Sequence, residues 1–62
     1  GVNEMANLDI RKKIAANFLK HWQVAAELNI HEAVLCRWMR NELTPERRVQ
    51  VLEAINKLAG EN

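Results

Sequence analysis

The segment His21–Arg40 limits the fold of this chain most tightly, because it divides into two short amphipathic halves on either side of Asn29. Apolar residues stand at positions 24, 25 and 28 in the first half, and at positions 34, 35, 38 and 39 in the second. Both spacings place the apolar groups on one side of a helix with about 3.6 residues per turn. Asn29 tolerates the left-handed backbone that a tight turn requires. The pattern predicts a helix-turn-helix, with Ala25 small enough for two steeply crossing helices to approach closely.

This segment resembles the helix-turn-helix of the Xre/Cro class of bacterial and phage regulators. Ala25 matches the family's small residue in the first helix. The family's apolar anchors match Leu28, Ile30, Leu35 and Trp38. The resemblance covers roughly residues 10–59. It implies an all-α, lambda-repressor-like bundle of four helices that contains the helix-turn-helix.

Three positions depart from the family's usual residues. Asn29 stands where the family usually has Gly, and His21 stands where it often has Gln. His31 occupies the cap before the second helix, where Ser or Thr is frequent. Asn is the mildest of these departures, because it is the natural substitute for Gly at positive φ.

Length and composition favour one small intracellular domain. The chain has 62 residues, a formal net charge of +1 and a single cysteine, and it contains no apolar run long enough for a membrane span. One cysteine forms no internal disulfide, so we expect a cytoplasmic protein. We expect a flexible N-terminus over residues 1–6 and, as the resemblance implies, a helix-turn-helix DNA-binding domain over residues 7–60. The near-neutral charge means that any basic surface must come from local arrangement.

Four helices are predicted. The first begins near Asn7 or Asp9, either of which can cap it, and its core stripe is Ile10, Ile14 and Phe18. Arg11, Lys12 and Lys13 lie off this stripe, either as a solvated face or facing phosphates. The second and third helices span residues 21–28 and 32–40.

The fourth predicted helix begins at Thr44-Pro45-Glu46, which combines a cap, a first-turn proline and an acid near the helix dipole. Leu43, just before it, should return to the core. Gly60 is a natural stop. The expected core positions of this helix are Val49, Leu52, Ile55 and Ala59, with Val51 and Leu58 flanking them.

Catalysis and metal binding find little support in the residues. The only metal-ligand candidates are His21, His31 and Cys36, which form no paired ligand motif. So small a chain offers no pocket for a Cys–His nucleophile or a small-molecule substrate. We therefore expect neither an enzyme nor a cofactor.

The resemblance implies double-stranded DNA as the partner, with the third helix in the major groove. The residues expected to contact bases are His31, Glu32, Ala33, Cys36 and Arg37. The residues expected to contact phosphates are Lys20, His21 and Arg40. Arg37 suits a guanine, and Ala33 suits a thymine methyl group. Glu32 suits a cytosine amine, although its charge also repels phosphates.

Several alternatives stay open at this point. Arg37 is also explained as an ordinary surface charge, and His21 as a helix cap. Trp38 is expected in the core, whereas Trp22 is a candidate for a partner surface. The leading hypothesis is a sequence-specific transcriptional regulator that is monomeric in solution and paired, if at all, on DNA. The alternative is a protein-interaction module, or a recombination accessory factor, that retains the fold.

Overall fold

The computed structural model describes residues 6–60, and within them the chain forms four α-helices and no strand. The helices are α1 (Leu8–Ala16), α2 (His21–Glu27), α3 (Glu32–Met39) and α4 (Pro45–Leu58). The predicted all-α class is confirmed. None of these helices is both long enough and apolar enough to cross a membrane.

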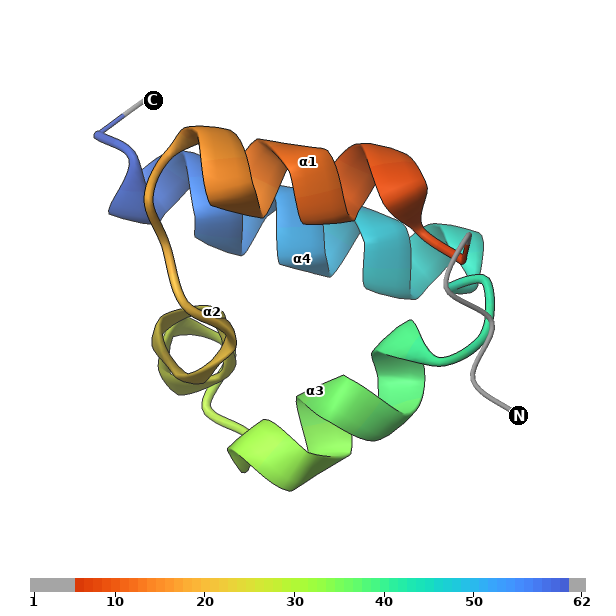
Figure 1. The fold of residues 1–62 in the computed structure, drawn as a ribbon. Helices are drawn as coiled ribbons and strands as arrows, with labels where there is room; N and C mark the ends of the chain where they lie inside the picture. The colour runs from red at the N-terminus through yellow and green to blue at the C-terminus, as the bar shows by residue number, and fades with distance from the viewer. Residues whose placement is uncertain (1–5, 61–62) are drawn as a thin grey trace.

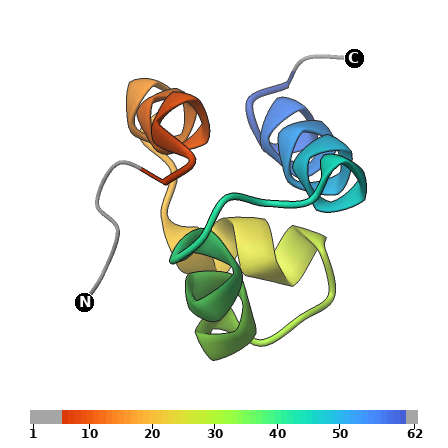
Figure 2. The same ribbon diagram turned by 90° about the vertical axis from the view of Figure 1, so that its right-hand side faces the viewer.

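The helices α1 and α4 lie side by side and run in the same direction, with α2 and α3 on one side of the pair (Figures 1 and 2). Near the start of both helices, the Arg48 guanidinium donates to the Asp9 carboxylate and lowers the pKa of that carboxyl. The helix α2 contacts both α3 and α4, so it connects the α1–α4 pair to α3.

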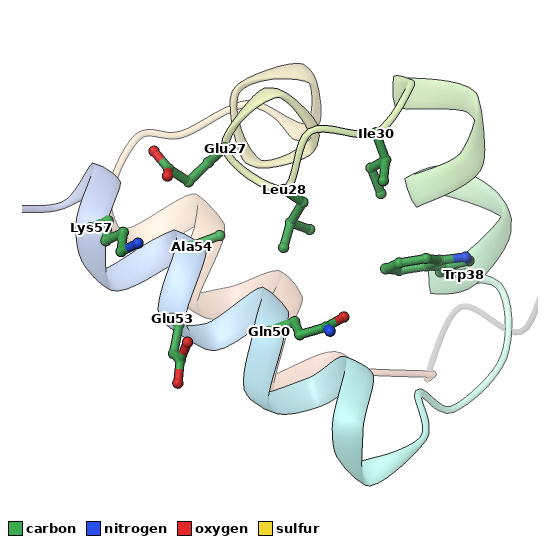
Figure 3. A pocket seen from close by; sticks show the side chains of 8 residues that line it. All are labelled: Glu27, Leu28, Ile30, Trp38, Gln50, Glu53, Ala54 and Lys57. Carbon is green, nitrogen blue, oxygen red and sulfur yellow. The ribbon is translucent and has the colours of Figure 1, made fainter.

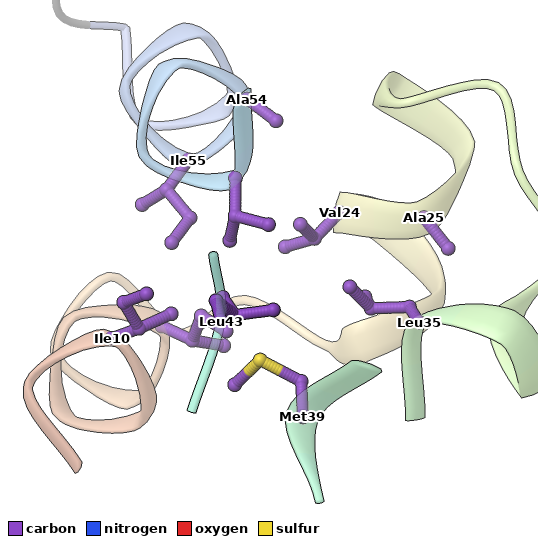
Figure 4. Close-up of a cluster of buried hydrophobic side chains, with 10 residues drawn as sticks. Ile10, Val24, Ala25, Leu35, Met39, Leu43, Ala54 and Ile55 are labelled. Atoms are coloured by element: carbon purple, nitrogen blue, oxygen red, sulfur yellow. The ribbon is translucent and has the colours of Figure 1, made fainter. Parts of the chain in front are cut away.

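The core lies where the four helices converge (Figure 4). Its buried side chains come from every helix and from the loop before α4: Ile10, Ile14, Val24, Ala25, Leu35, Met39, Leu43, Val51, Ala54 and Ile55. Leu43 is buried as predicted. Burial of this kind supplies most of the favourable free energy of folding.

The predicted core stripe of the first helix is correct at Ile10 and Ile14 but wrong at Phe18, whose side chain is 91% exposed. The helix ends at Ala16, and Phe18 adopts a left-handed conformation with a φ of 57°. The stripe therefore stops before it reaches Phe18. Leu19 packs against the core in its place.

The predicted core face of the fourth helix is also partly wrong. Val49 is 55% exposed, whereas Val51 is fully buried beside Ile55. Positions 49, 52 and 55 and positions 51, 55 and 58 both follow helical spacing, so periodicity alone did not choose between these overlapping stripes. The Thr44 cap is confirmed, because its Oγ1 accepts from the backbone N–H of Arg47 at 3.3 Å. Gly60 follows the helix with a φ of 82°, as expected of a stop.

Asn7 precedes α1 but does not cap it with its side chain, contrary to the sequence prediction. The residue is buried and left-handed, with a φ of 57°. Its Nδ2 donates to the carbonyls of Met39 at 3.2 Å and Asn41 at 2.8 Å, and its Oδ1 accepts from the N–H of Leu43 at 2.9 Å. Asn7 thus links the start of α1 by hydrogen bonds to the end of α3 and the loop that follows it.

Ala6 adds to this attachment. It is fully buried, so the expected flexible N-terminus does not extend to residue 6; residues 1–5 lie outside the described part of the chain. The Arg11 guanidinium donates to the carbonyls of Ala6 at 2.9 Å and Met39 at 2.8 Å. Arg11 therefore has a structural role, which neither sequence interpretation of this basic run included.

Candidate nucleic-acid interface

The turn between α2 and α3 has the conformation that the sequence predicts. Asn29 is left-handed, with a φ of 60°. The N–H of Ile30 donates to the carbonyl of Ala25 at 3.0 Å, which closes the end of α2. Ala25 is buried at this junction, where its small side chain allows α2 and α3 to approach closely. The two helices thus form a helix-turn-helix.

His31 caps α3 through an unusual acceptor. Its Nδ1 accepts from the backbone N–H of Ala33 at 3.2 Å, so one imidazole nitrogen satisfies an otherwise free amide of the first turn. The prediction that His31 occupies the cap is confirmed. Its side chain is exposed, and its capping role fixes where the imidazole lies at the mouth of the helix.

The helix α3 has one buried and one exposed face. Leu35 and Met39 point into the core and are almost completely inaccessible. The residues predicted to contact bases reach the surface: His31, Glu32, Ala33 and Arg37 are exposed, and Cys36 is partly exposed. All five side chains are thus accessible from outside the protein.

Trp38 is less central than the sequence indicates. It packs against the core but stays partly exposed, and Met39 beside it is the buried anchor. The Arg47 guanidinium covers the Trp38 ring at 4.5 Å from its centroid, the geometry of a cation–π contact.

Two of the predicted phosphate contacts lie at the start of α2. Lys20 occupies the cap position, and its backbone N–H donates to Gln23 Oε1 at 2.8 Å. His21 is therefore the first helical residue rather than the cap, which removes the alternative given for it. Lys20 is exposed and His21 is partly exposed.

A shallow hollow brings these residues together with the start of α3. We call it the α1–α2 hollow, and its lining residues are Arg11, Ile14, Ala15, Leu19, Lys20, His21, Trp22 and Glu32. The structure thus places Glu32 near the two predicted phosphate contacts, although the sequence assigned it to base edges. The Trp22 side chain, which also lines this hollow, is 58% exposed.

The other end of α3 has a different environment. Arg37 lines a second hollow together with Trp38 and Arg47, and Arg40 is exposed immediately after the helix. The contact of Arg47 with Trp38 was not predicted from the sequence. The available signal was a basic residue in the first turn of the helix that follows the predicted recognition helix.

A groove with both polar and apolar walls lies between α4 and the α2–α3 turn (Figure 3). Leu28, Ile30, Trp38 and Ala54 contribute its apolar surface. The polar side chains around it are Glu27, Gln50, Glu53 and Lys57. None of the residues predicted to contact DNA lines this groove.

The candidate metal ligands are not brought together in residues 6–60. No group of three or more His, Cys, Asp or Glu side chains is placed to hold a metal ion within this part of the chain. His21 and Cys36 belong to different helices, and the His31 imidazole is engaged in capping α3.

Comparisons with protein-family models, with curated proteins and with solved structures give no match to this chain. Any function must therefore be argued from its own residues and their geometry.

Proposed function

We propose that this protein binds double-stranded DNA sequence-specifically, with α3 in the major groove, as a small cytoplasmic transcriptional regulator of bacterial or phage type. One observation carries the proposal: a helix-turn-helix whose second helix buries Leu35 and Met39 and exposes the opposite face. Such a helix fits the width of the major groove, and its N-terminal residues approach base edges first.

The exposed residues of α3 have chemically distinct roles in this proposal. Arg37 presents two parallel donors to the O6 and N7 atoms of a guanine, and Ala33 contacts a thymine methyl group. Glu32 and His31 lie at the groove entrance, where Glu32 accepts from a cytosine amine and disfavours other bases. Cys36 is partly exposed next to Arg37, and in this proposal it makes a van der Waals contact with the bases.

Phosphate contacts set the position of the helix on the duplex. Lys20 and His21 at the start of α2 meet one strand, and Arg40 after α3 meets the backbone at the other end. Because the net charge is only +1 with histidines counted as neutral, Lys20 and Arg40 have to provide most of the electrostatic attraction.

Selection of bound duplexes from a random pool tests the proposal directly. We expect a recovered motif, and we expect Arg37→Ala to weaken binding to it by about 1–3 kcal/mol and to relax one base position. Lys57→Ala is the matched control, since it also removes an exposed cation but lies on the groove of Figure 3. An equal loss in both variants would contradict the assigned reading face.

A single recognition helix reads few base pairs, so useful specificity requires pairing on DNA or a partner domain. Val51 and Leu58 flank the expected core face of α4 and could form a small two-fold patch only if both were exposed, but Val51 is fully buried. We therefore propose a monomer in solution. Sedimentation equilibrium checks it, and a stable dimer at low micromolar concentration would contradict it.

The groove in Figure 3 favours a second candidate, a protein-interaction module that keeps the fold without binding DNA. A salt titration separates the two. The affinity of a DNA-binding protein falls steeply as salt rises, because bound phosphates release counterions. An interaction module retains no duplex at any ionic strength.

A further inference from the structure

Trp22 is a large apolar side chain left 58% exposed by a domain that has few residues to bury. Burying a tryptophan would add much to the stability of so small a fold. The side chain lies in the first turn of α2, immediately after His21. Tryptophan is enriched at contact surfaces, because its ring is apolar while its N–H is polar.

The α1–α2 hollow that Trp22 lines combines two kinds of surface. Ile14, Ala15 and Leu19 add apolar atoms to the indole. Arg11 and Lys20 bring two positive charges to the hollow against the single carboxylate of Glu32, and His21 adds an imidazole. An occupant that matches both properties carries an anionic group next to an apolar face.

The two cationic side chains of the hollow are not equally free to bind. The Arg11 guanidinium already donates to two backbone carbonyls, so it contributes charge but is held in place. Lys20 is exposed, and only its backbone takes part in the cap of α2. The Lys20 ammonium is therefore the cation of the hollow that remains available to a ligand.

The location of the hollow points to one occupant. Glu32, the first residue of the proposed recognition helix, lines the same hollow as Trp22. A duplex that receives the start of α3 in its major groove therefore brings a backbone strand past this hollow. A deoxyribose–phosphate strand carries the required pair of groups, an apolar sugar face beside a phosphate.

We propose that Trp22 packs on a deoxyribose next to the phosphate contact already proposed for Lys20, so that the α1–α2 hollow binds one deoxyribose–phosphate strand at the edge of the recognised site. This inference rests on the proposed DNA binding and extends it. Trp22 then adds affinity that is independent of base sequence and nearly independent of salt, whereas Lys20 adds affinity that depends on salt.

The test measures dissociation constants for the selected duplex over a range of salt concentrations. We expect Trp22→Ala to weaken binding roughly tenfold, as truncation of an interface aromatic does, with an unchanged salt slope. Lys20→Ala should reduce the slope by about one phosphate contact. Phe18→Ala is the matched control, because Phe18 is another exposed aromatic but does not line the hollow; it should bind as the wild type does.

Two further measurements keep the test decisive. Trp22→Phe retains an apolar ring, so it should keep most of the affinity even where Trp22→Ala folds poorly. Tryptophan emission of the wild type should change on adding duplex, and this change should be absent in Trp22→Phe, which retains only Trp38.

The outcomes separate the inference from the proposed function. If the wild type binds no duplex, the proposed function fails and the inference falls with it. If the wild type binds but folded Trp22→Ala binds equally well, only the inference is overturned. A loss confined to one base position, or retention of the wild type by anionic phospholipid vesicles but not by duplex, would also overturn it.

Discussion

The turns that end α1 and α2 have the same geometry but different residues. The N–H groups of Phe18 and Leu19 donate to Ala15 and Ile14, all at 3.0 Å, just as the N–H groups of Asn29 and Ile30 donate to Ala26 and Ala25. The left-handed residue has a φ of 57° in the first turn and 60° in the second. This is the Schellman pattern in both cases. Asn suits it, whereas a bulky aromatic residue does not.

The comparison indicates what imposes each turn. In both, the residue after the left-handed one, Leu19 or Ile30, packs against the core. That contact commonly accompanies this motif and holds the chain in it. At Asn29 the local preference and the packing agree. At Phe18 the packing prevails over an unfavourable local conformation.

The largest expected effect concerns the buried residue beneath each turn, Ile14 in the first and Ala25 in the second. Ile14→Ala should lower the free energy of unfolding by about 2–5 kcal/mol, because it leaves a cavity. Ala25→Val should lower it by about 1–3 kcal/mol, because it overfills the close contact of α2 with α3. Urea denaturation measures both, with Ile14→Val as the graded variant. If Ala25→Val were neutral, the second turn would not depend on a close approach.

A third left-handed residue, Asn7, extends the comparison. Gly accepts its φ of 57° without strain, but Asn7→Gly loses the side-chain hydrogen bonds to Met39, Asn41 and Leu43. Unpaired buried polar groups are costly, so we expect a loss of about 2–4 kcal/mol in urea denaturation. Asn7→Gly with wild-type stability would mean that only the backbone conformation matters there.

Asn29 should show the opposite dependence, because its side chain is exposed. Asn29→Ala should lower the free energy of unfolding by about 1–2 kcal/mol, because alanine lacks the local hydrogen bonding that lets Asn adopt the left-handed conformation. Asn29→Gly should stay within a few tenths of a kcal/mol of the wild type. Thermal denaturation compares the three proteins. A larger loss for Gly than for Ala would show that the Asn29 side chain makes an essential contact.

These residues also show how much the sequence predicts. The helix-turn-helix was predictable because Asn29, Ala25 and the apolar spacing of α3 all favour it locally. The exposure of Phe18 and the burial of Val51 were not, since both depend on how α1, α2 and α4 pack together. The hydrogen bonds of Asn7 join residues more than 30 positions apart, with no local signal. In the same way, the sequence indicated the exposed face of α3 but not that Glu32 and Trp22 line one hollow.

The smallest expected effect is a gain in stability at the first turn. Phe18→Gly relieves the strain of a left-handed aromatic residue, and it removes little burial because the Phe18 side chain is 91% exposed. Relief of this strain should stabilise the fold by about 1–2 kcal/mol, and the greater freedom of Gly in the unfolded chain offsets part of this. The net increase in the free energy of unfolding should be about 0.5–1 kcal/mol. A domain of this size should then melt several degrees higher, on the order of 4–8 °C per kcal/mol.

Phe18→Ala is the control for this last prediction, since it removes the ring but keeps a Cβ at a φ of 57°. We expect its melting temperature to stay near that of the wild type, because alanine bears the same left-handed strain. A similar gain for both variants would trace the effect to removal of an exposed aromatic ring rather than to the backbone. A loss in both would mean that the Phe18 ring stabilises the turn, and the two turns would then differ in their packing as well as in their residues.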